Sequence, residues 1–153
     1  MNGVLSRKQR EYLKKARVAR LATVDQKNSV HLVPVVFANS GNTIYFVIDR
    51  KTKTGRELKR LKNIYETGRA SLLIDNYSEN WEELSFLLLT CSATVIGPGA
   101  SLSKKRFAAK ELKRKYAQYA RSDYFPENID AAIFVRLEPQ KAVFWQNLRR
   151  SLA

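Results

Sequence analysis

The chain has 153 residues, of which 44% are hydrophobic and 27% charged, a composition typical of a globular domain that excludes a disordered tail or a fibre. Its 28 Lys and Arg against 14 Asp and Glu give a net charge of +14, which favours an anionic ligand or partner. A single cysteine, Cys91, excludes an internal disulfide and a Cys-cluster zinc site. With no apolar run near the roughly 18 residues of a membrane span and no secretion signal, we expect a cytoplasmic, single-domain protein over residues 1–153.

The first predicted element is a helix over residues 6–17, where Ser6 and Gln9 have capping-box spacing. Three β-rich segments separated by polar turns follow, and they predict an antiparallel meander over residues 18–24, 30–37 and 43–48. The second of those turns is predicted at residues 39–42.

A second helix is predicted over residues 54–66, because the apolar positions change to a helical period there. Thr54 and Glu57 have capping-box spacing, and Gly68 follows as a stop signal. The rest of the chain predicts strands and one helix, with a turn at Glu138-Pro139-Gln140. The predicted strands are 69–74, 84–96 (one bent strand or two short ones), 131–137 and 141–145, and the helix is 103–119. Short connections between strands favour a mainly β fold, an antiparallel barrel with helices at its edges.

Positive charge gathers in two segments, residues 50–62 and 104–115. The first leads from the end of a strand into the start of a helix, where free backbone N–H groups and the helix dipole attract anions. Lys51 and Lys53, with Arg56 or Arg60, are therefore predicted to bind a phosphate. The second segment is either a solvated helix face or a further anion-binding surface.

The remaining chemistry-bearing residues are few. His31 is the only histidine, and no pair of carboxylates has the spacing of an acid-base dyad, so most hydrolase mechanisms and a metal site are disfavoured. Trp81 and Trp145 either pack in a core or interface, or wall a pocket for a flat heterocycle. If the chain is an enzyme, we expect a cofactor to supply the chemistry and leave its catalytic residues unassigned.

Several segments in order resemble the pyridoxamine 5'-phosphate oxidase-like split-barrel flavoproteins. They are Ala16–Asp25, His31–Phe37, Ile44–Asp49, Lys51-Thr52-Lys53, Leu58–Ile64 and Leu73–Tyr77 with Trp81. More narrowly, they look like the subgroup of probable deazaflavin-dependent enzymes. Residues 115–119 and the strand that ends at Trp145 extend the resemblance weakly.

This resemblance implies a homodimer of six-stranded split β-barrels with flanking helices, which holds FMN or a deazaflavin (coenzyme F-420) at the dimer interface. It also implies a flavin- or deazaflavin-dependent oxidoreductase that transfers a hydride to or from a small organic substrate. The residues that match cofactor-binding positions are Arg20, Val33, Pro34, Val35, Lys51, Lys53, Arg60 and Trp81. The extra positive charge favours the deazaflavin, whose oligoglutamate tail could meet Arg106, Lys110 and Arg114.

Two alternatives stay open at this point. A basic, non-enzymatic barrel that binds nucleic acid would use the net charge together with Tyr116, Tyr119 and Tyr124, which lie among or just beyond basic residues. A haem-binding barrel would use His31 as its imidazole ligand.

Overall fold

The computed structural model describes residues 3–49, 58–121 and 123–147. The helices are α1 (Arg7–Lys15), α2 (Lys59–Thr67), η1 (Trp81–Glu83), α3 (Leu102–Lys115) and α4 (Ala117–Arg121). The strands are β1 (Ala19–Val24), β2 (Val30–Val35), β3 (Ala38–Ser40), β4 (Thr43–Val47), β5 (Arg69–Asn76), β6 (Ser85–Ile96) and β7 (Phe134–Gln146).

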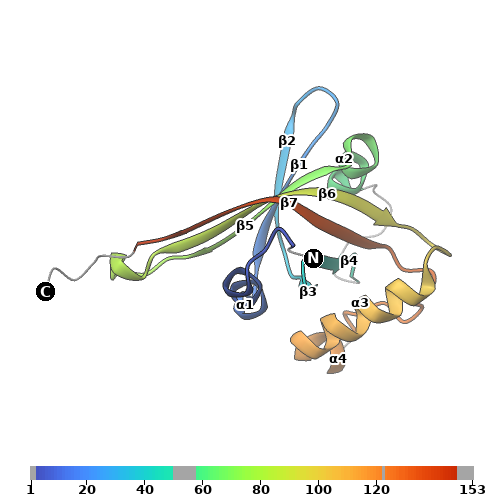
Figure 1. Ribbon diagram of the computed structural model, residues 1–153. Helices are drawn as coiled ribbons and strands as arrows, with labels where there is room; N and C mark the ends of the chain where they lie inside the picture. The colour runs from blue at the N-terminus through green and yellow to red at the C-terminus, as the bar shows by residue number, and fades with distance from the viewer. Residues whose placement is uncertain (1–2, 50–57, 122, 148–153) are drawn as a thin grey trace, which may run out of the picture.

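One antiparallel sheet of seven strands forms the body of the molecule, in the order β2-β1-β5-β6-β7-β4-β3. The strands at its two edges, β2 and β3, are joined through Val36 and Phe37 alone. Because so short a link cannot cross a flat sheet, the sheet curls until its two edges approach at one corner. The expected split-barrel class with flanking helices is confirmed (Figure 1).

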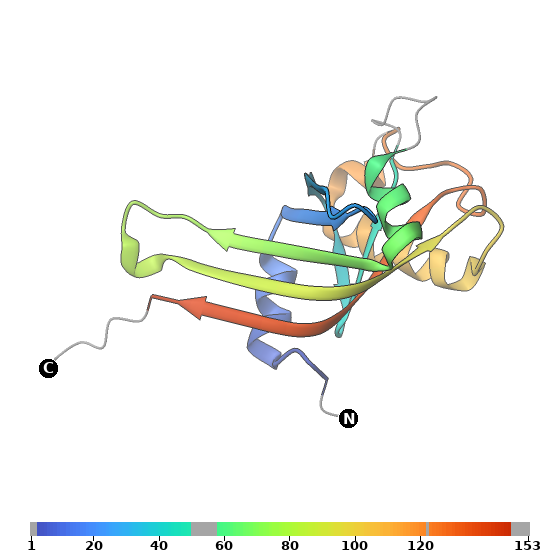
Figure 2. The same cartoon turned by 90° about the horizontal axis from the view of Figure 1, so that it is seen from above.

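The strands β5, β6 and β7 are much longer than the others and run out of the barrel as a three-stranded arm, with η1 near its tip (Figures 1 and 2). Alternation along these strands puts Leu72, Leu87 and Leu89 inside the sheet, where they are buried. The opposite, outer face carries the half-exposed side chains of Leu88, Val143 and others.

Two apolar clusters stabilise the fold. The larger one fills the barrel and takes in Leu13 of α1 and Ile64 of α2. The second lies between β4 and the pair α3 and α4, and includes Leu112, Tyr119 and Phe134. The larger cluster therefore packs α2 against the barrel, and the second packs α4 near the corner where β2 turns into β3.

Several predicted boundaries were wrong. The resemblance implied six strands, but Asn39 and Ser40, predicted as a turn, pair with β4 as the short seventh strand β3. Asn39 is buried there although asparagine favours turns, so tertiary pairing overrides its local preference. The helix predicted over 103–119 breaks at Tyr116, whose extended backbone separates α3 from α4.

The predicted turn at Glu138-Pro139-Gln140 is a β-bulge inside the single long strand β7. Cys91 faces Pro139 and Thr90 faces Lys141, so Gln140 is the extra residue. Proline suits this position because it has no N–H to donate to a ladder.

The predicted capping box of Ser6 and Gln9 is present at the start of α1. The described part of α2 begins at Lys59, and the second predicted capping box, Thr54 and Glu57, lies outside the described residues.

Candidate functional site

A pocket of about 310 Å³ lies at the corner where β2 turns towards β3. This corner pocket is lined by Val18, Pro34, Val35, Val36, Phe46, Val47, Asp49, Arg60 and Tyr119. Six of these nine residues are Val, Pro or Phe, and the three polar ones come from the end of β4, from α2 and from α4. A mostly apolar wall with a few polar groups is the usual composition of a small-molecule site.

The polar side of the corner pocket is built around Arg60. Its Nε atom is buried and has no hydrogen-bond partner among the described residues. Burial lowers the pKa of the Arg60 guanidinium, while the carboxylate of Asp49 acts in the opposite direction. An arginine remains charged under both influences, so the pocket holds a cation with an unused donor.

Tyr119 holds Asp49 in place on the other side of the pocket. The Tyr119 hydroxyl donates to Asp49 Oδ2 at 2.8 Å. Burial and the neighbouring Asp49 carboxylate raise the pKa of Tyr119 well above its ordinary value, so the hydroxyl keeps its proton at physiological pH.

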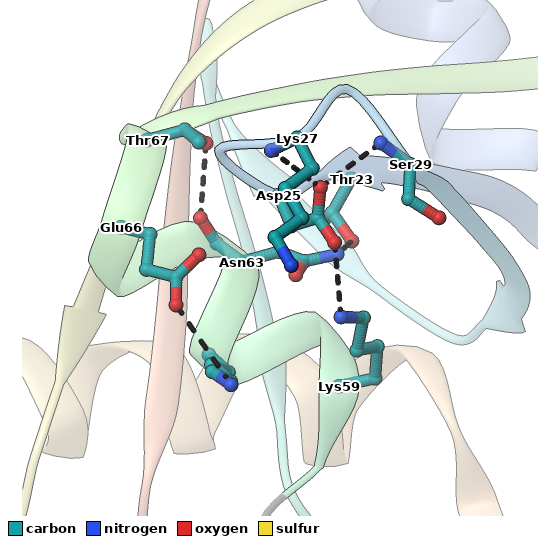
Figure 3. A network of polar contacts seen from close by, with 9 residues as sticks. Thr23, Asp25, Lys27, Ser29, Lys59, Asn63, Glu66 and Thr67 are labelled. Atoms are coloured by element: carbon teal, nitrogen blue, oxygen red, sulfur yellow. Dashed lines mark hydrogen bonds and ion pairs between the residues drawn. The ribbon is translucent and has the colours of Figure 1, made fainter.

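A polar network fixes the position of α2, and with it Arg60. Lys59 Nζ lies 3.2 Å from Asp25 Oδ2, and Asn63 Nδ2 donates to Thr23 Oγ1 at 3.0 Å (Figure 3). Asp25 also accepts from the backbone N–H groups of the β1–β2 turn, and these contacts hold its pKa below the usual value. Since Asn63 and Thr23 are both buried, the network ties the first turns of α2 to the hairpin that supplies Pro34 and Val35.

Four of the eight predicted site residues lie at or beside the corner pocket. Pro34, Val35 and Arg60 line it. Arg20 stands opposite Pro34 in the β1–β2 register and forms an ion pair with Asp75 at 3.3 Å. Segments far apart in sequence therefore meet at this corner.

Of the other four, Val33 and Trp81 do not line the pocket, and Lys51 and Lys53 lie outside the described residues. Val33 stands opposite Leu21 and packs against the barrel core. Trp81 is in η1 near the tip of the arm, at the opposite end of β5 from α2, and is 65% exposed. Lys51 and Lys53, like Arg56, lie outside the described residues.

Sequence reasoning did not assign a cofactor-binding role to Asp49, Tyr119 or Val18, which also line the corner pocket. Asp49 and Tyr119 are 70 positions apart, so no spacing rule connects them. The resemblance included both residues within quoted segments, and that was the one signal that could have singled them out.

A second hollow, of about 260 Å³, lies on the sheet towards the turn between β1 and β2 and shares no lining residue with the corner pocket. Its lining includes the small side chains of Ala22, Ser71 and Thr90, which stand in one cross-strand row. Small residues leave the sheet surface open at this point. The buried thiol of Cys91 also lines it, and burial raises its pKa to about 12, so the thiol is unreactive.

His31 does not line the pockets described above. It lies on β2 opposite Thr23 of β1 and is partly buried, and its Nδ1 atom is buried without a hydrogen-bond partner in the described chain.

Across residues 3–49, 58–121 and 123–147, no group of three or more His, Cys, Asp and Glu has the arrangement of a metal site. In the same ranges no helix has the length and hydrophobicity needed to cross a bilayer.

The basic segment 104–115 is not uniformly solvated. Lys105 is fully buried, and its Nζ donates to the carbonyl oxygen of Asp130 at 2.8 Å. Lys115 Nζ donates to the carbonyl oxygen of Leu13 at 3.1 Å. Arg106 and Lys110 are exposed, and Arg114 Nη1 forms an ion pair with Glu111 Oε1 at 3.5 Å. The surface predicted to bind anions therefore has fewer exposed, unpaired cations than the number of basic residues in the segment indicated.

Comparison with known proteins places this geometry in a family. The family model described as pyridoxamine 5'-phosphate oxidase matches residues 5–146. No curated protein matches the sequence.

Among solved structures, a conserved hypothetical protein from Mycobacterium tuberculosis superposes with a TM-score of 0.71 at 15% identity, covering 98% of this chain and 93% of that one. HutZ, the haem storage protein from Vibrio cholerae, gives a TM-score of 0.63 at 11% identity, with 93% and 94% covered. A protein described as an F-420 reductase gives 0.62 at 14% identity, with 91% and 98% covered. At these identities the likeness shows the shared fold.

Proposed function

The chain belongs to the pyridoxamine 5'-phosphate oxidase family, and on this basis we propose that it is an oxidoreductase that binds a phosphate-bearing flavin or deazaflavin at the corner pocket. The single observation that carries the proposal is the buried Nε of Arg60, a donor atom without a partner among the described residues in a pocket whose wall is mostly apolar. A donor of this kind suits a phosphate oxygen. Both an F-420 reductase and a haem storage protein share the fold, so the cofactor has to be tested directly.

The residues present fit such a cofactor. Arg60 would bind the phosphate, and Pro34, Val35 and Phe46 would contact the ring system and exclude water from it. When bound, a flavin or deazaflavin accepts or donates a hydride at its ring. The protein then needs to orient the ring and the substrate and to exclude water from them, and it does not need an acid-base pair. Tyr119 keeps the Asp49 carboxylate in place by hydrogen bonding.

We also propose that the working unit is a homodimer. A pocket of about 310 Å³ is at the lower end of the roughly 300–1,000 Å³ typical of ligand sites, so a second chain is expected to complete it. The outer face of the arm offers an apolar surface for that contact. Leu88 and Val143 stand opposite each other there, and Phe86 stacks on Trp145 with ring centroids 5.7 Å apart.

The test is a side-by-side titration of the purified protein with FMN and with coenzyme F-420, following ring fluorescence at physiological salt. We expect micromolar binding of one cofactor and a loss of tenfold or more in Arg60→Ala, because a charge-assisted phosphate contact is removed. Lys62→Ala is the matched control: it removes the same charge from α2 at a residue that pairs with Glu66 and does not line the pocket. Equal affinity in both variants would contradict the assigned role of Arg60.

Two other results would replace the proposal. Binding of haem, with a Soret band that is lost in His31→Ala, would favour the function of the haem storage relative. Binding of neither cofactor, combined with retention on DNA that falls steeply with salt, would favour the nucleic-acid alternative.

A further inference from the structure

A separate pocket of about 310 Å³ lies where α1, β3 and α3 meet, away from the corner pocket. It is lined by Lys14, Ala38, Asn39, Glu111, Arg114 and Lys115. Three of these side chains are cationic and one is anionic, so the lining has a net positive charge. An anion is the favoured ligand.

Lys115 is unusual among the basic residues of this chain because it is held in place. Its Nζ donates to the carbonyl oxygen of Leu13, one of the last carbonyls of α1, and lies 3.9 Å from the centre of the Phe37 ring. Its own carbonyl oxygen accepts from Arg17 at 3.0 Å. These contacts fix the amine at the wall of the pocket rather than leaving it on a mobile stem.

The surroundings of Lys115 favour the neutral amine. Burial, with the nearby Arg17 guanidinium as a smaller cause, lowers the pKa of Lys115 to about 8. The other charged groups around the pocket are Lys14 on α1 and Glu111 and Arg114 on α3. A larger share of the Lys115 amine is therefore neutral near pH 7.5 than of an ordinary lysine.

Asn39 supplies an independent indication of a ligand. It is 94% buried, since its relative exposure is 6%, and its Nδ2 donates to the carbonyl oxygen of Gly41. Its Oδ1 atom is buried and has no partner among the described residues. A buried acceptor without a partner costs free energy unless something binds to it.

We propose that this pocket takes a small carboxylate-bearing aldehyde or keto acid and that Lys115 binds it covalently as an imine. The amine nitrogen adds to the carbonyl carbon, the carbonyl oxygen leaves as water, and a C=N bond forms without any oxidant or reductant. Arg114 and Lys14 meet the carboxylate of the ligand. This site does not depend on the flavin or deazaflavin proposed above.

The experiment uses glyoxylate as the probe, with cyanoborohydride to reduce the imine, followed by peptide mass spectrometry at pH 7.5. We expect Lys115 to be labelled at least tenfold more than the exposed Lys110 and Lys113 of the same helix. The pH dependence of its labelling should have a midpoint near 8. Lys115→Arg, which keeps the cation and the donor to Leu13, should abolish the selective label, and Lys110→Arg should preserve it.

The anion preference is tested with glycolaldehyde, an uncharged aldehyde of similar size. Arg114→Gln should lower glyoxylate labelling of Lys115 severalfold and leave glycolaldehyde labelling unchanged, while the control Lys110→Gln should alter neither. Equal labelling of Lys115 and Lys110 in the folded wild type would overturn the proposal. An equal effect of Arg114→Gln on both probes would overturn the carboxylate assignment.

Discussion

At the scale of single residues, the Thr23 and Asn63 pair shows how one buried hydrogen bond supports the site. Thr23→Val leaves Asn63 Nδ2 buried without an acceptor and should lower the free energy of unfolding by about 1–3 kcal/mol. Asn63→Leu should have a similar cost. The double variant should cost clearly less than the sum, because both polar partners are then gone. Urea unfolding of the four proteins measures this, and strict additivity would show that the bond contributes little.

A second prediction at this scale concerns Lys115 and the pH dependence of the free energy of unfolding. The folded chain releases the Lys115 proton near pH 8 and the unfolded chain near 10.5, so between these values the unfolded state holds more protons. The free energy of unfolding should therefore rise with pH in that window, relative to Lys115→Met. Denaturant midpoints of both proteins at pH 7.5 and 9.5 check this. Measurements stop below pH 10, because tyrosines with raised pKa, such as Tyr119, then destabilise the fold.

At the scale of elements, the bulge in β7 decides which side chains reach the core. Before it, Val135 and Leu137 are buried; after it, Ala142 and Phe144 pack against the core instead, because Gln140 shifts the alternation by one position. Because residue 140 is the unpaired one, deleting Gln140 makes the β6–β7 ladder regular and keeps Ala142 and Phe144 facing the core, so the deletion should cost less than about 3 kcal/mol.

The matched control for this deletion is Gln140→Ser, which keeps the residue count. The Gln140 side chain is exposed, so its replacement should change the free energy of unfolding by no more than about 0.5 kcal/mol. Circular dichroism and urea unfolding of both variants make the comparison. A deletion variant that fails to fold would show that the sheet needs the bend that the bulge introduces.

At the scale of the whole molecule, charge and apolar surface are segregated. Between Arg69 and Lys104 there is no Lys or Arg, and this stretch includes η1 and most of β5 and β6. The arm thus carries acidic and aromatic side chains, including Glu82, Glu83 and Trp81, while the net charge of the chain is +14. An acidic arm and a basic barrel are complementary between two copies.

The proposed dimer gives a prediction at this scale. Leu88→Lys places a cation at the centre of the outer sheet face, opposite Val143 and Leu73, and should shift the protein from dimer to monomer. Val4→Lys adds the same charge at another exposed apolar residue, away from the sheet, and should leave the protein a dimer. Light scattering during gel filtration measures both. A monomeric wild type would contradict the proposed assembly.

The sequence by itself determined the class of fold and most of its elements. Local patterns were sufficient for α1, with its capping box, for the end of α2 at Gly68, which adopts a left-handed backbone with φ of 64°, and for β1 and β6. Such signals act over a few residues, so they can be read without knowledge of the rest of the chain. The ordered segments that carried the resemblance were likewise sufficient for the family.

Only the tertiary structure decided which residues come together in each site. The pairing of β3 with β4, the bulge at Gln140, and the meeting of Asp49, Arg60 and Tyr119 all depend on contacts between distant segments. The same holds for Lys115, whose place in the sequence predicted either a solvated helix face or an anion-binding surface. Its chemistry is set by burial beside α1 and by the nearby Arg17, and burial is a property of the folded chain.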